Sequence, residues 1–351
     1  MGVPAVLGLA TAYPGKAFTQ EFVLSELSRL WAGRPVDWKR LEQFHKATRV
    51  RRRYFALPLS RRRSMSSLAE RNRNWQEEAS ALAERALVEA LSRAKVSPQD
   101  LDHLLLTTST GVALPSIDAR VANRLRLNLG LTRWPMSGFG CLGGGAAFVR
   151  AAKILSGERG GLAAVVAVEL FSSTLQVDDF SDANLIATGL FGDGASAAVL
   201  GQVEWRSGPR IAATRSVLFP DTEWAMGWDL RDTGFGVVLS QKVPKLVEEN
   251  LPGAIQSLLA SQNLYRDDVK HWVVHPGGPK ILEGLQDRLK LKPDALRHSW
   301  KSLEEAGNLS SASVLDVFNR LMEAKETKMG DIGMLVAMGP GFGAELAVVK
   351  F

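Results

Sequence analysis

Short apolar runs alternate with helix-type patterns along most of the chain. Between residues 64 and 95, apolar side chains recur at helical spacing, which predicts one long amphipathic helix. Residues 162–170 instead form a continuous apolar run, which is typical of a strand covered on both faces. The alternation returns in the second half, where a strand and loop at 269–278 precede another helix-type pattern. The chain is therefore predicted to form an α/β fold whose buried sheet is covered by helices.

The pattern repeats between the two halves of the chain. His103 lies 38 residues before Cys141, and His271 lies 37 residues before Asn308. The runs LFGDGASAAVL and GPGFGAELAVV also end their halves alike. This similarity predicts two related α/β units, with Cys141 and Asn308 at equivalent bends between a strand and a helix.

Length and composition agree with a duplicated globular protein. The 351 residues exceed a usual single domain, and the predicted halves are 1–210 and 211–351. With 46% hydrophobic and 23% charged residues, the chain can bury a large core. No window is apolar enough for a membrane span, and the N-terminal segment is predicted to be a first strand rather than a signal peptide. One cysteine excludes an intramolecular disulfide and a Cys-rich metal site, which indicates a cytoplasmic location.

The net charge of +6 includes two arginine blocks. One comprises Arg49 and residues 51–53, and the other residues 61–63. Such blocks bind nucleic acid, a membrane surface or a phosphorylated small molecule such as coenzyme A, or they are simply solvated surface. Because no aromatic residues interleave the arginines and no helix-turn-helix or zinc pattern accompanies them, we do not expect nucleic acid as a partner.

Candidate chemistry centres on the lone Cys141 in GFGCLGGGAA. The flanking glycines permit a tight bend, and a thiol at the start of a helix lies at the positive end of the backbone dipole. His275 in VVHPGG and Asn308 in GNLSSAS follow later in the chain. Taken singly, these residues are as well explained by a buried cysteine, a turn histidine and a helix-capping asparagine. Their placement at corresponding ends of the two halves favours an activated thiolate with a histidine partner.

Six stretches carry a resemblance to a known family. They are TTSTGVALPSIDARVANRL, GFGCLGG, LFGDGASAAVL, VVHPGGPKIL, GNLSSASVL and AMGPGFGAEL, in family order. The chain resembles the type III polyketide synthases, the chalcone-synthase-like branch of the thiolase-fold condensing enzymes. The resemblance implies a homodimer with a five-layer αβαβα core that loads an acyl group from acyl-CoA and extends it with malonyl-CoA. No metal or redox cofactor is expected.

The resemblance also implies roles for individual residues. Cys141 carries the acyl group, His275 stabilises its thiolate as an ion pair, and His275 and Asn308 donate to the enolate oxygen formed by malonyl decarboxylation. Phe191 matches the family's gatekeeper phenylalanine. Val237 stands where a second one is usual.

Further pocket and coenzyme A residues follow from the same register. Trp228 replaces a glycine of the plant enzymes, Leu114 is expected to reach into the partner's cavity, and Ser109 and Ser310 are cavity polar groups. The coenzyme A site is predicted to use Lys39, Lys46, Arg49 and Arg53, with Glu42 in place of one family cation. The segment MGWDLRDTGFGVVLSQKVP resembles bacterial members that make alkylpyrones or alkylresorcinols from long acyl starters, so a long-chain starter and a pyrone or resorcinol-type product are expected.

Three alternatives remain open. A β-ketoacyl-acyl-carrier-protein synthase III also uses Cys, His and Asn, although its histidine usually lies in a motif different from HPGGP. A papain-like protease shares the residue order, but its cysteine stands beside a tryptophan-containing motif. A non-enzymatic basic binding protein would not need Cys141 at all.

Overall fold

The computed structural model describes residues 2–60, 67–157, 161–202 and 208–351, so the second arginine block lies outside the described residues. The first half contains β1 (Pro4–Ala12), β2 (Ala17–Thr19), α1 (Gln20–Leu30), α2 (Trp38–Ala47), β3 (Arg52–Tyr54), α3 (Leu68–Ala94), η2 (Pro98–Asp100), β4 (His103–Thr107), α4 (Ile117–Leu125), β5 (Thr132–Met136), η3 (Gly140–Leu142), α5 (Gly143–Gly157), β6 (Leu162–Glu169), η4 (Phe171–Ser173), α6 (Asp182–Leu190) and β7 (Gly194–Gln202). The second half contains β8 (Arg210–Leu218), η5 (Glu223–Ala225), β9 (Met226–Arg231), β10 (Gly234–Leu239), α7 (Val243–Ala260), η6 (Arg266–Asp268), β11 (Val269–Val274), α8 (Pro279–Arg288), α9 (Arg297–Ala306), η7 (Ser310–Ala312), α10 (Ser313–Ala324), β12 (Ile332–Gly339) and β13 (Gly343–Lys350).

The main sheet shows the duplication directly. Its strand order is β11-β12-β13-β8-β1-β7-β6-β4-β5. On either side of the β1–β8 junction the strands pair first antiparallel, then antiparallel, then parallel. The two wings meet through a single residue pair, Ala5 with Arg210, so one continuous sheet bends into two layers.

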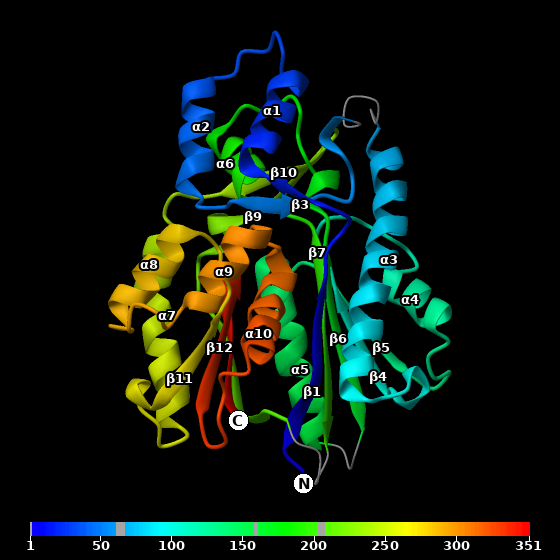
Figure 1. Ribbon diagram of the computed structural model, residues 1–351, viewed down its shortest axis with the longest axis vertical. Coiled ribbons are helices and arrows are strands. Elements are labelled where there is room, and N and C mark those ends of the chain that lie inside the picture. Colours follow the sequence, from blue (N-terminus) through cyan, green and yellow to red (C-terminus); the bar gives the residue numbers. More distant parts are fainter. Residues whose placement is uncertain (1, 61–66, 158–160, 203–207) are drawn as a thin grey trace.

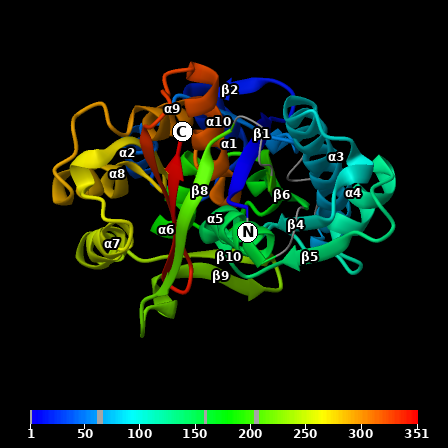
Figure 2. The ribbon, with the colours of Figure 1, turned by 90° about the horizontal axis from the view of Figure 1, so that it is seen from below.

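Helices fill the space between the wings and cover their outer faces. Helices α5 and α10 lie between the wings, α3 and α4 cover one outer face, and α7 and α8 cover the other (Figure 2). The central core includes Phe148 of α5 and Phe318 of α10, whose rings meet edge to face. Separate apolar clusters lie under α3 and under α7. The predicted five-layer αβαβα arrangement of duplicated halves is confirmed.

The long predicted helix is present with shorter bounds. Ser67 caps it by accepting a hydrogen bond from Glu70 N, and Lys95 ends it in the left-handed region at φ 55°. Among the apolar residues of this pattern, Trp75, Ala79 and Leu82 are buried, whereas Val88 is 47% exposed. Val88 lies outside the stripe that faces the sheet, because that stripe runs through Ala83, Ala86, Leu87, Ala90 and Leu91.

A cap of α1, α2 and α6 lies at one end of the molecule, beside β3 and the β9–β10 hairpin (Figure 1). Its core contains Leu27, Trp31 and Leu185, all buried. The segment after α6 bridges to the loop before η7, so the cap is joined directly to the second half. None of the helices in the described part of the chain is long and apolar enough to cross a membrane.

Candidate active site

Two equivalent bends bring the candidate residues together. Cys141 is the middle residue of η3, which leads into α5, and Ser311 holds the corresponding position of η7, which leads into α10. Gly140 has φ +47°, which L side chains rarely adopt. A Cβ on Gly144 would lie 2.0 Å from the Ser311 carbonyl oxygen, so only glycine allows the bends to approach this closely. Asn308 lies three residues ahead of Ser311; the bends are equivalent as predicted, but Ser311 rather than Asn308 is the counterpart of Cys141.

Hydrogen bonds fix the orientation of the Asn308 carboxamide. Its Oδ1 accepts from Ser310 N at 2.7 Å and from Ser313 Oγ at 3.4 Å. Its Nδ2 therefore points the other way and donates to Gly277 O at 3.3 Å. Since the amide group carries two hydrogens, one remains for a ligand. Ser310 supports this geometry from a left-handed backbone conformation at φ 50°.

His275 directly follows β11, and its backbone N–H donates to Val336 O at 2.8 Å. The imidazole is 1% exposed, and its Nδ1 has no hydrogen-bond partner among the described residues. Burial lowers the pKa of His275 to about 3. Burial therefore favours the neutral ring.

Burial is also the largest influence on the pKa of the Cys141 thiol. It raises the thiol pKa to about 11, against hydrogen bonds from Ser310 and Asn308 that lower it, while the nearby Glu169 carboxylate raises it further. The net shift favours the protonated thiol. The thiolate–imidazolium pair expected from the sequence stays a prediction, against which burial of both groups acts.

A buried carboxylate lies behind the thiol. Glu169 ends β6, is fully buried, and accepts hydrogen bonds from Ser109 N at 3.0 Å, from Ser109 Oγ at 3.0 Å and from Ser311 Oγ at 2.5 Å. Burial raises its pKa to about 7, and these hydrogen bonds oppose that shift. Glu169 therefore ties the loop after β4 to η7 and changes charge near neutral pH.

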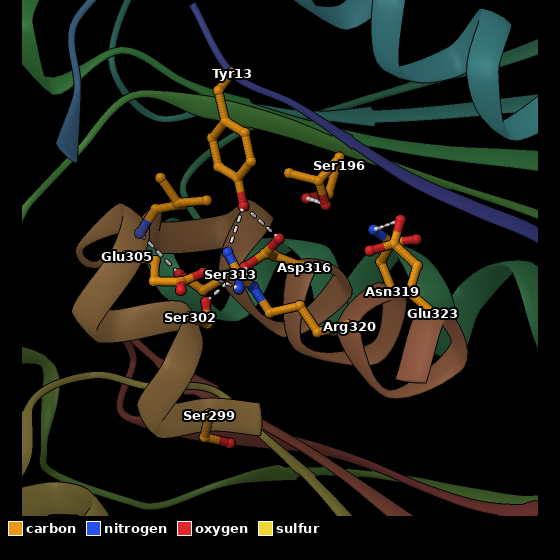
Figure 3. Close-up of polar contacts among 12 residues, drawn as sticks. Tyr13, Ser196, Ser299, Ser302, Glu305, Ser313, Asp316, Asn319, Arg320 and Glu323 are labelled. Carbon is orange, nitrogen blue, oxygen red and sulfur yellow. Dashed lines mark hydrogen bonds and ion pairs between the residues drawn. The ribbon is translucent and has the colours of Figure 1, made fainter. Parts of the chain in front are cut away.

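A polar cluster holds the helices on either side of the Asn308 loop. Asp316 of α10 accepts from Tyr13 Oη at 2.7 Å, from Ser302 Oγ of α9 at 2.7 Å and from Arg320 Nε at 2.8 Å (Figure 3). Arg320 also donates to Glu305 of α9 at 2.8 Å. These bonds connect β1, α9 and α10, so the loop between the two helices has fixed ends.

The candidate residues line one cavity of about 440 Å³. This volume lies within the roughly 300–1,000 Å³ of typical small-molecule sites. Phe171 stacks on Phe191 with ring centroids 4.1 Å apart, and Trp228 continues this aromatic wall at 5.8 Å from Phe171. Trp228 is paired in register with Val237 across the β9–β10 hairpin. The lining comprises Thr108, Ser109, Gly111, Val112, Ser137, Gly138, Gly140, Cys141, Phe171, Leu190, Phe191, Met226, Gly227, Trp228, Phe235, Val237, Val238, Leu239, His275, Gly277, Ile281, Asn308, Ser310, Met338 and Pro340.

The cavity thus contains the three predicted catalytic residues and the predicted pocket residues except Leu114. Leu114 is 99% exposed and lies outside the cavity of its own chain. Its predicted contribution to a partner's cavity stays a prediction.

The predicted coenzyme A residues fall into two groups. Lys39, Lys46 and Glu42 are exposed on α2, and Arg49 is exposed, paired with Glu283 of α8. Arg53 is only 1% exposed, so the prediction that it contacts coenzyme A phosphates is wrong. Its guanidinium donates instead to the carbonyl oxygens of Thr188 and Phe191.

Sequence reasoning missed Glu169, Phe171 and Ser311. One signal was available, since Glu169 is a lone acid at the end of the apolar run LAAVVAVE, where a charge needs buried partners. Phe171 and Ser311 carried no comparable signal, because a phenylalanine after a strand and a serine in a serine-rich loop are ordinary features.

Comparison with known proteins agrees with this geometry. A cysteine, a histidine and an asparagine at the bends of a duplicated five-layer fold define a thiolase-fold condensing enzyme. The family models for chalcone and stilbene synthases match at residues 1–203 for the N-terminal domain and 210–351 for the C-terminal domain. The chain therefore belongs to the chalcone and stilbene synthase family and is a type III polyketide synthase, an acyltransferase that catalyses decarboxylative Claisen condensations on coenzyme A thioesters.

Relatives and solved structures cover nearly the whole chain. A 1,3,6,8-tetrahydroxynaphthalene synthase of Streptomyces peucetius subsp. caesius is 40% identical over 99% of this chain and 93% of its own length. A phloroglucinol synthase of Pseudomonas fluorescens is 31% identical, covering 96% of each chain. The crystal structure of the 1,3,6,8-tetrahydroxynaphthalene synthase of Streptomyces coelicolor A3(2) superposes with a TM-score of 0.92 at 30% identity, covering 99% of each chain. The family assignment excludes the protease and the non-enzymatic binding protein.

Proposed function

We propose that the enzyme loads a small acyl group from a coenzyme A thioester onto Cys141, extends it with malonyl-CoA, and cyclises the chain to a compact polyhydroxylated aromatic product. The observation that carries this proposal is the single cavity of about 440 Å³ in which thiol, imidazole and carboxamide meet under an aromatic wall. The relatives named as tetrahydroxynaphthalene and phloroglucinol synthases support a product of this size.

Loading follows from the neutral resting site. As Cys141 Sγ attacks the thioester carbonyl, its proton passes to His275, and the new sulfur–carbon bond replaces the bond to coenzyme A. The imidazolium then returns the proton to the departing coenzyme A thiol. Burial makes the charged pair short-lived, which keeps the site neutral between steps.

Extension uses the free hydrogen of the Asn308 amide. Malonyl-CoA loses carbon dioxide, and the electron pair left behind forms an enolate whose oxygen accepts from His275 and Asn308. The enolate carbon attacks the acyl carbonyl on Cys141, so a carbon–carbon bond forms and the carbon–sulfur bond breaks. This sequence needs no metal or redox cofactor.

We further propose that the protein is a cytoplasmic homodimer. Strand β5 is an edge of the main sheet, and its Trp134 is 43% exposed. Leu114 and Val112 are exposed on the loop between β4 and α4, and Val112 also lines the cavity. An apolar surface next to a cavity suits a partner that completes the cavity wall.

The sequence predicts a long-chain acyl starter, which is the alternative to the small starter proposed above. Purified protein should be incubated with malonyl-CoA alone and with short, aromatic and long acyl-CoAs, and the products identified by mass spectrometry. We expect malonyl-CoA alone or short starters to give the main product. Predominant alkylpyrones or alkylresorcinols would favour the long-chain form, and no malonyl-derived product with any starter would refute both.

A strict requirement for malonyl-acyl-carrier protein would instead indicate synthase III chemistry. The Cys141→Ala variant is the control, because it keeps the fold but removes the acyl acceptor. Condensed products from this variant, with a new carbon–carbon bond, would refute the role of Cys141, whereas acetyl-CoA formed by decarboxylation alone would not.

A further inference from the structure

Arg53 belongs to an arginine block but differs from its neighbours. Arg49, Arg51 and Arg52 form ion pairs on the surface with Glu283, Glu304 and Glu305. The side chain of Arg53 turns inward from β3 and is buried. A buried arginine needs fixed partners, because its charge is costly to remove from water.

The hydrogen-bond partners of Arg53 are neutral oxygens around the end of α6, and the buried Asp193 carboxylate also stabilises its charge. Its Nη1 donates to Thr188 O at 2.6 Å and to Phe191 O at 3.0 Å, and its Nη2 donates to Gln20 Oε1 at 2.6 Å. A cation beside the last carbonyls of a helix is favoured by the helix dipole. Arg53 therefore serves as a C-terminal cap of α6.

The cap is complete for the last turn of α6. Gly189 O accepts from Gln20 Nε2 at 2.9 Å and from Thr48 Oγ1 at 3.2 Å. Leu190 O accepts from Asn308 N at 2.9 Å. The carbonyls of 188 and 191 depend on Arg53, so its loss would leave two buried acceptors without this donor.

The same segment holds both Phe191 and Asn308. Phe191 and Asn308 form a parallel bridge, and Gly192 N donates to Asn308 O at 3.1 Å. The Arg53 stem also lies against the Asn308 loop, since a Cβ on Gly307 would be 3.2 Å from Arg53 Cδ. Asn308 is therefore held at its backbone N and O by a segment that Arg53 fixes.

We propose that Arg53 is a positioning residue that holds the Asn308 carboxamide and the Phe191 ring in place for malonyl-CoA decarboxylation. Cys141 depends on it less directly, because η3 follows from β5 and packs against β12, and Arg53 reaches the thiol only through the hydrogen bonds from Ser310 and Asn308. This inference rests on the proposed function, in which Asn308 stabilises the enolate. It predicts that two reactions respond differently to a change at Arg53: the decarboxylation of malonyl-CoA, which needs Asn308, and the reaction of the Cys141 thiol with an electrophile. These are called the two half-reactions below.

The test compares those half-reactions in Arg53→Met and Arg53→Lys. We expect Arg53→Met to lower kcat for decarboxylation of malonyl-CoA to acetyl-CoA by tenfold or more, on the order of one charged hydrogen bond. Alkylation of Cys141 by iodoacetamide should fall by a smaller factor than decarboxylation, because Arg53 influences the thiol only through the Asn308 loop. Arg53→Lys keeps one charged donor and should recover part of the decarboxylation rate.

Two controls separate the possible outcomes. Thr48→Val removes one of the two bonds to Gly189 O, leaves the Arg53 donors in place, and should lower decarboxylation per folded molecule much less than Arg53→Met does. If Arg53→Met does not fold, Gln20→Leu, which removes one Arg53 partner, should show a smaller effect in the same direction. Asn308→Ala tests the proposed function itself: normal decarboxylation in that variant would refute the role of Asn308, whatever Arg53 does.

Parallel loss of both half-reactions in Arg53→Met, or no loss in either, would overturn the positioning role. The positioning role would also be overturned if Arg53→Lys restored Tm but not the decarboxylation rate. That result would show that Arg53 acts only as a structural cap of α6.

Discussion

Phe171 and Phe191 stack face to face, with ring centroids 4.1 Å apart and planes 5° from parallel. The pair, together with Val237, forms a wall common to the catalytic cavity and to a second, smaller cavity of about 40 Å³. The smaller cavity is mainly apolar and lies under α1, where Val23 and Leu27 line it. The stack therefore sets how far the catalytic cavity extends toward the cap.

Removing one ring should join the two cavities. In Phe171→Ala, we expect longer acyl-CoAs to gain in kcat/KM relative to short ones, on the order of tenfold, because a few methylenes find apolar space. Stability should fall by about 3 kcal/mol, as for other large-to-small changes at packed aromatic rings. Kinetics with a series of acyl-CoAs checks the first point and denaturant unfolding the second.

Phe219→Ala is the matched control, since Phe219 packs against Phe342 away from the cavity. It should lower stability without changing starter preference. An unchanged preference in Phe171→Ala would mean that the stack does not limit the cavity.

The Trp228–Val237 register pair should control product size where the β9–β10 hairpin continues the same wall. Trp228→Gly enlarges the cavity at the hairpin, so we expect products with more malonyl units, whereas Val237→Phe narrows it and should give shorter ones. Leu230→Gly is the control for weakening β9, because Leu230 is 70% exposed on the same strand and outside the cavity. Product masses provide the measurement. The same product distribution from Trp228→Gly and Val237→Phe would show that the β9–β10 hairpin does not limit the length of the polyketide chain.

Much of this site follows from sequence because glycines and periodicity are local signals. The bend at Cys141 is readable from its glycine run, and the duplicated order predicts that Asn308 lies on the matching bend. Arg53 could not be assigned this way. Its sequence neighbours are surface arginines, and only the return of α6 and the Asn308 loop to β3 buries it.

The pKa of the Cys141 thiol could also not be predicted from the sequence. The glycine bend and the start of a helix favour a thiolate, but the depth of the site is set by the whole fold. Burial outweighs the helix and raises the thiol pKa instead. Local patterns therefore predict which groups meet, while the packed fold decides their charge.

Glu169 should link activity and stability to pH. Its pKa is raised by burial from 4.5 to about 7, so the native state keeps a proton that the unfolded state loses. Stability from this group is fully present below pH 4.5 and is lost as pH rises through 7, by roughly 3 kcal/mol. Denaturant unfolding from pH 4.5 to 8 should show a flatter profile in Glu169→Gln than in the wild type.

Glu169→Gln should also lower the pKa of the Cys141 thiol. Because the Glu169 carboxylate raises the Cys141 pKa, its replacement should move the pH profile of Cys141 alkylation to lower pH, with a rate gain above pH 7 only. Glu323→Gln, on the surface, is the control. An unchanged alkylation profile would show that the carboxylate does not influence the thiol.

Exposed lysines on α2 should contribute to coenzyme A binding. Lys39→Ala and Lys46→Ala are each expected to raise KM for acyl-CoA by roughly fivefold, about the effect of one solvent-screened ion pair, with kcat unchanged. The increase should shrink at high salt. Lys328→Ala is the control, because it lies before β12, at the end of the strand away from the site. Equal effects of Lys39 and Lys328 would indicate a general charge effect rather than a site.

The exposed Leu114 and Trp134 should mark the dimer contact. We expect Trp134→Lys to give monomers at micromolar concentration by light scattering with size exclusion, because a charge would be buried at the edge of β5. Trp224→Lys is the control, since Trp224 is 49% exposed on a different part of the molecule. Monomeric wild-type protein would contradict the proposed dimer.

Leu114→Gly then tests whether the contact completes the cavity. This variant should remain dimeric but change the distribution of products, because the partner's cavity loses part of its wall. In mixed dimers with Cys141→Ala protomers, the only active site belongs to the Leu114→Gly protomer and faces a normal Leu114 from its partner. Its product distribution should therefore return to that of the wild type. If the mixed dimers keep the altered distribution, Leu114 acts within its own chain, and the proposed contribution across the dimer is wrong.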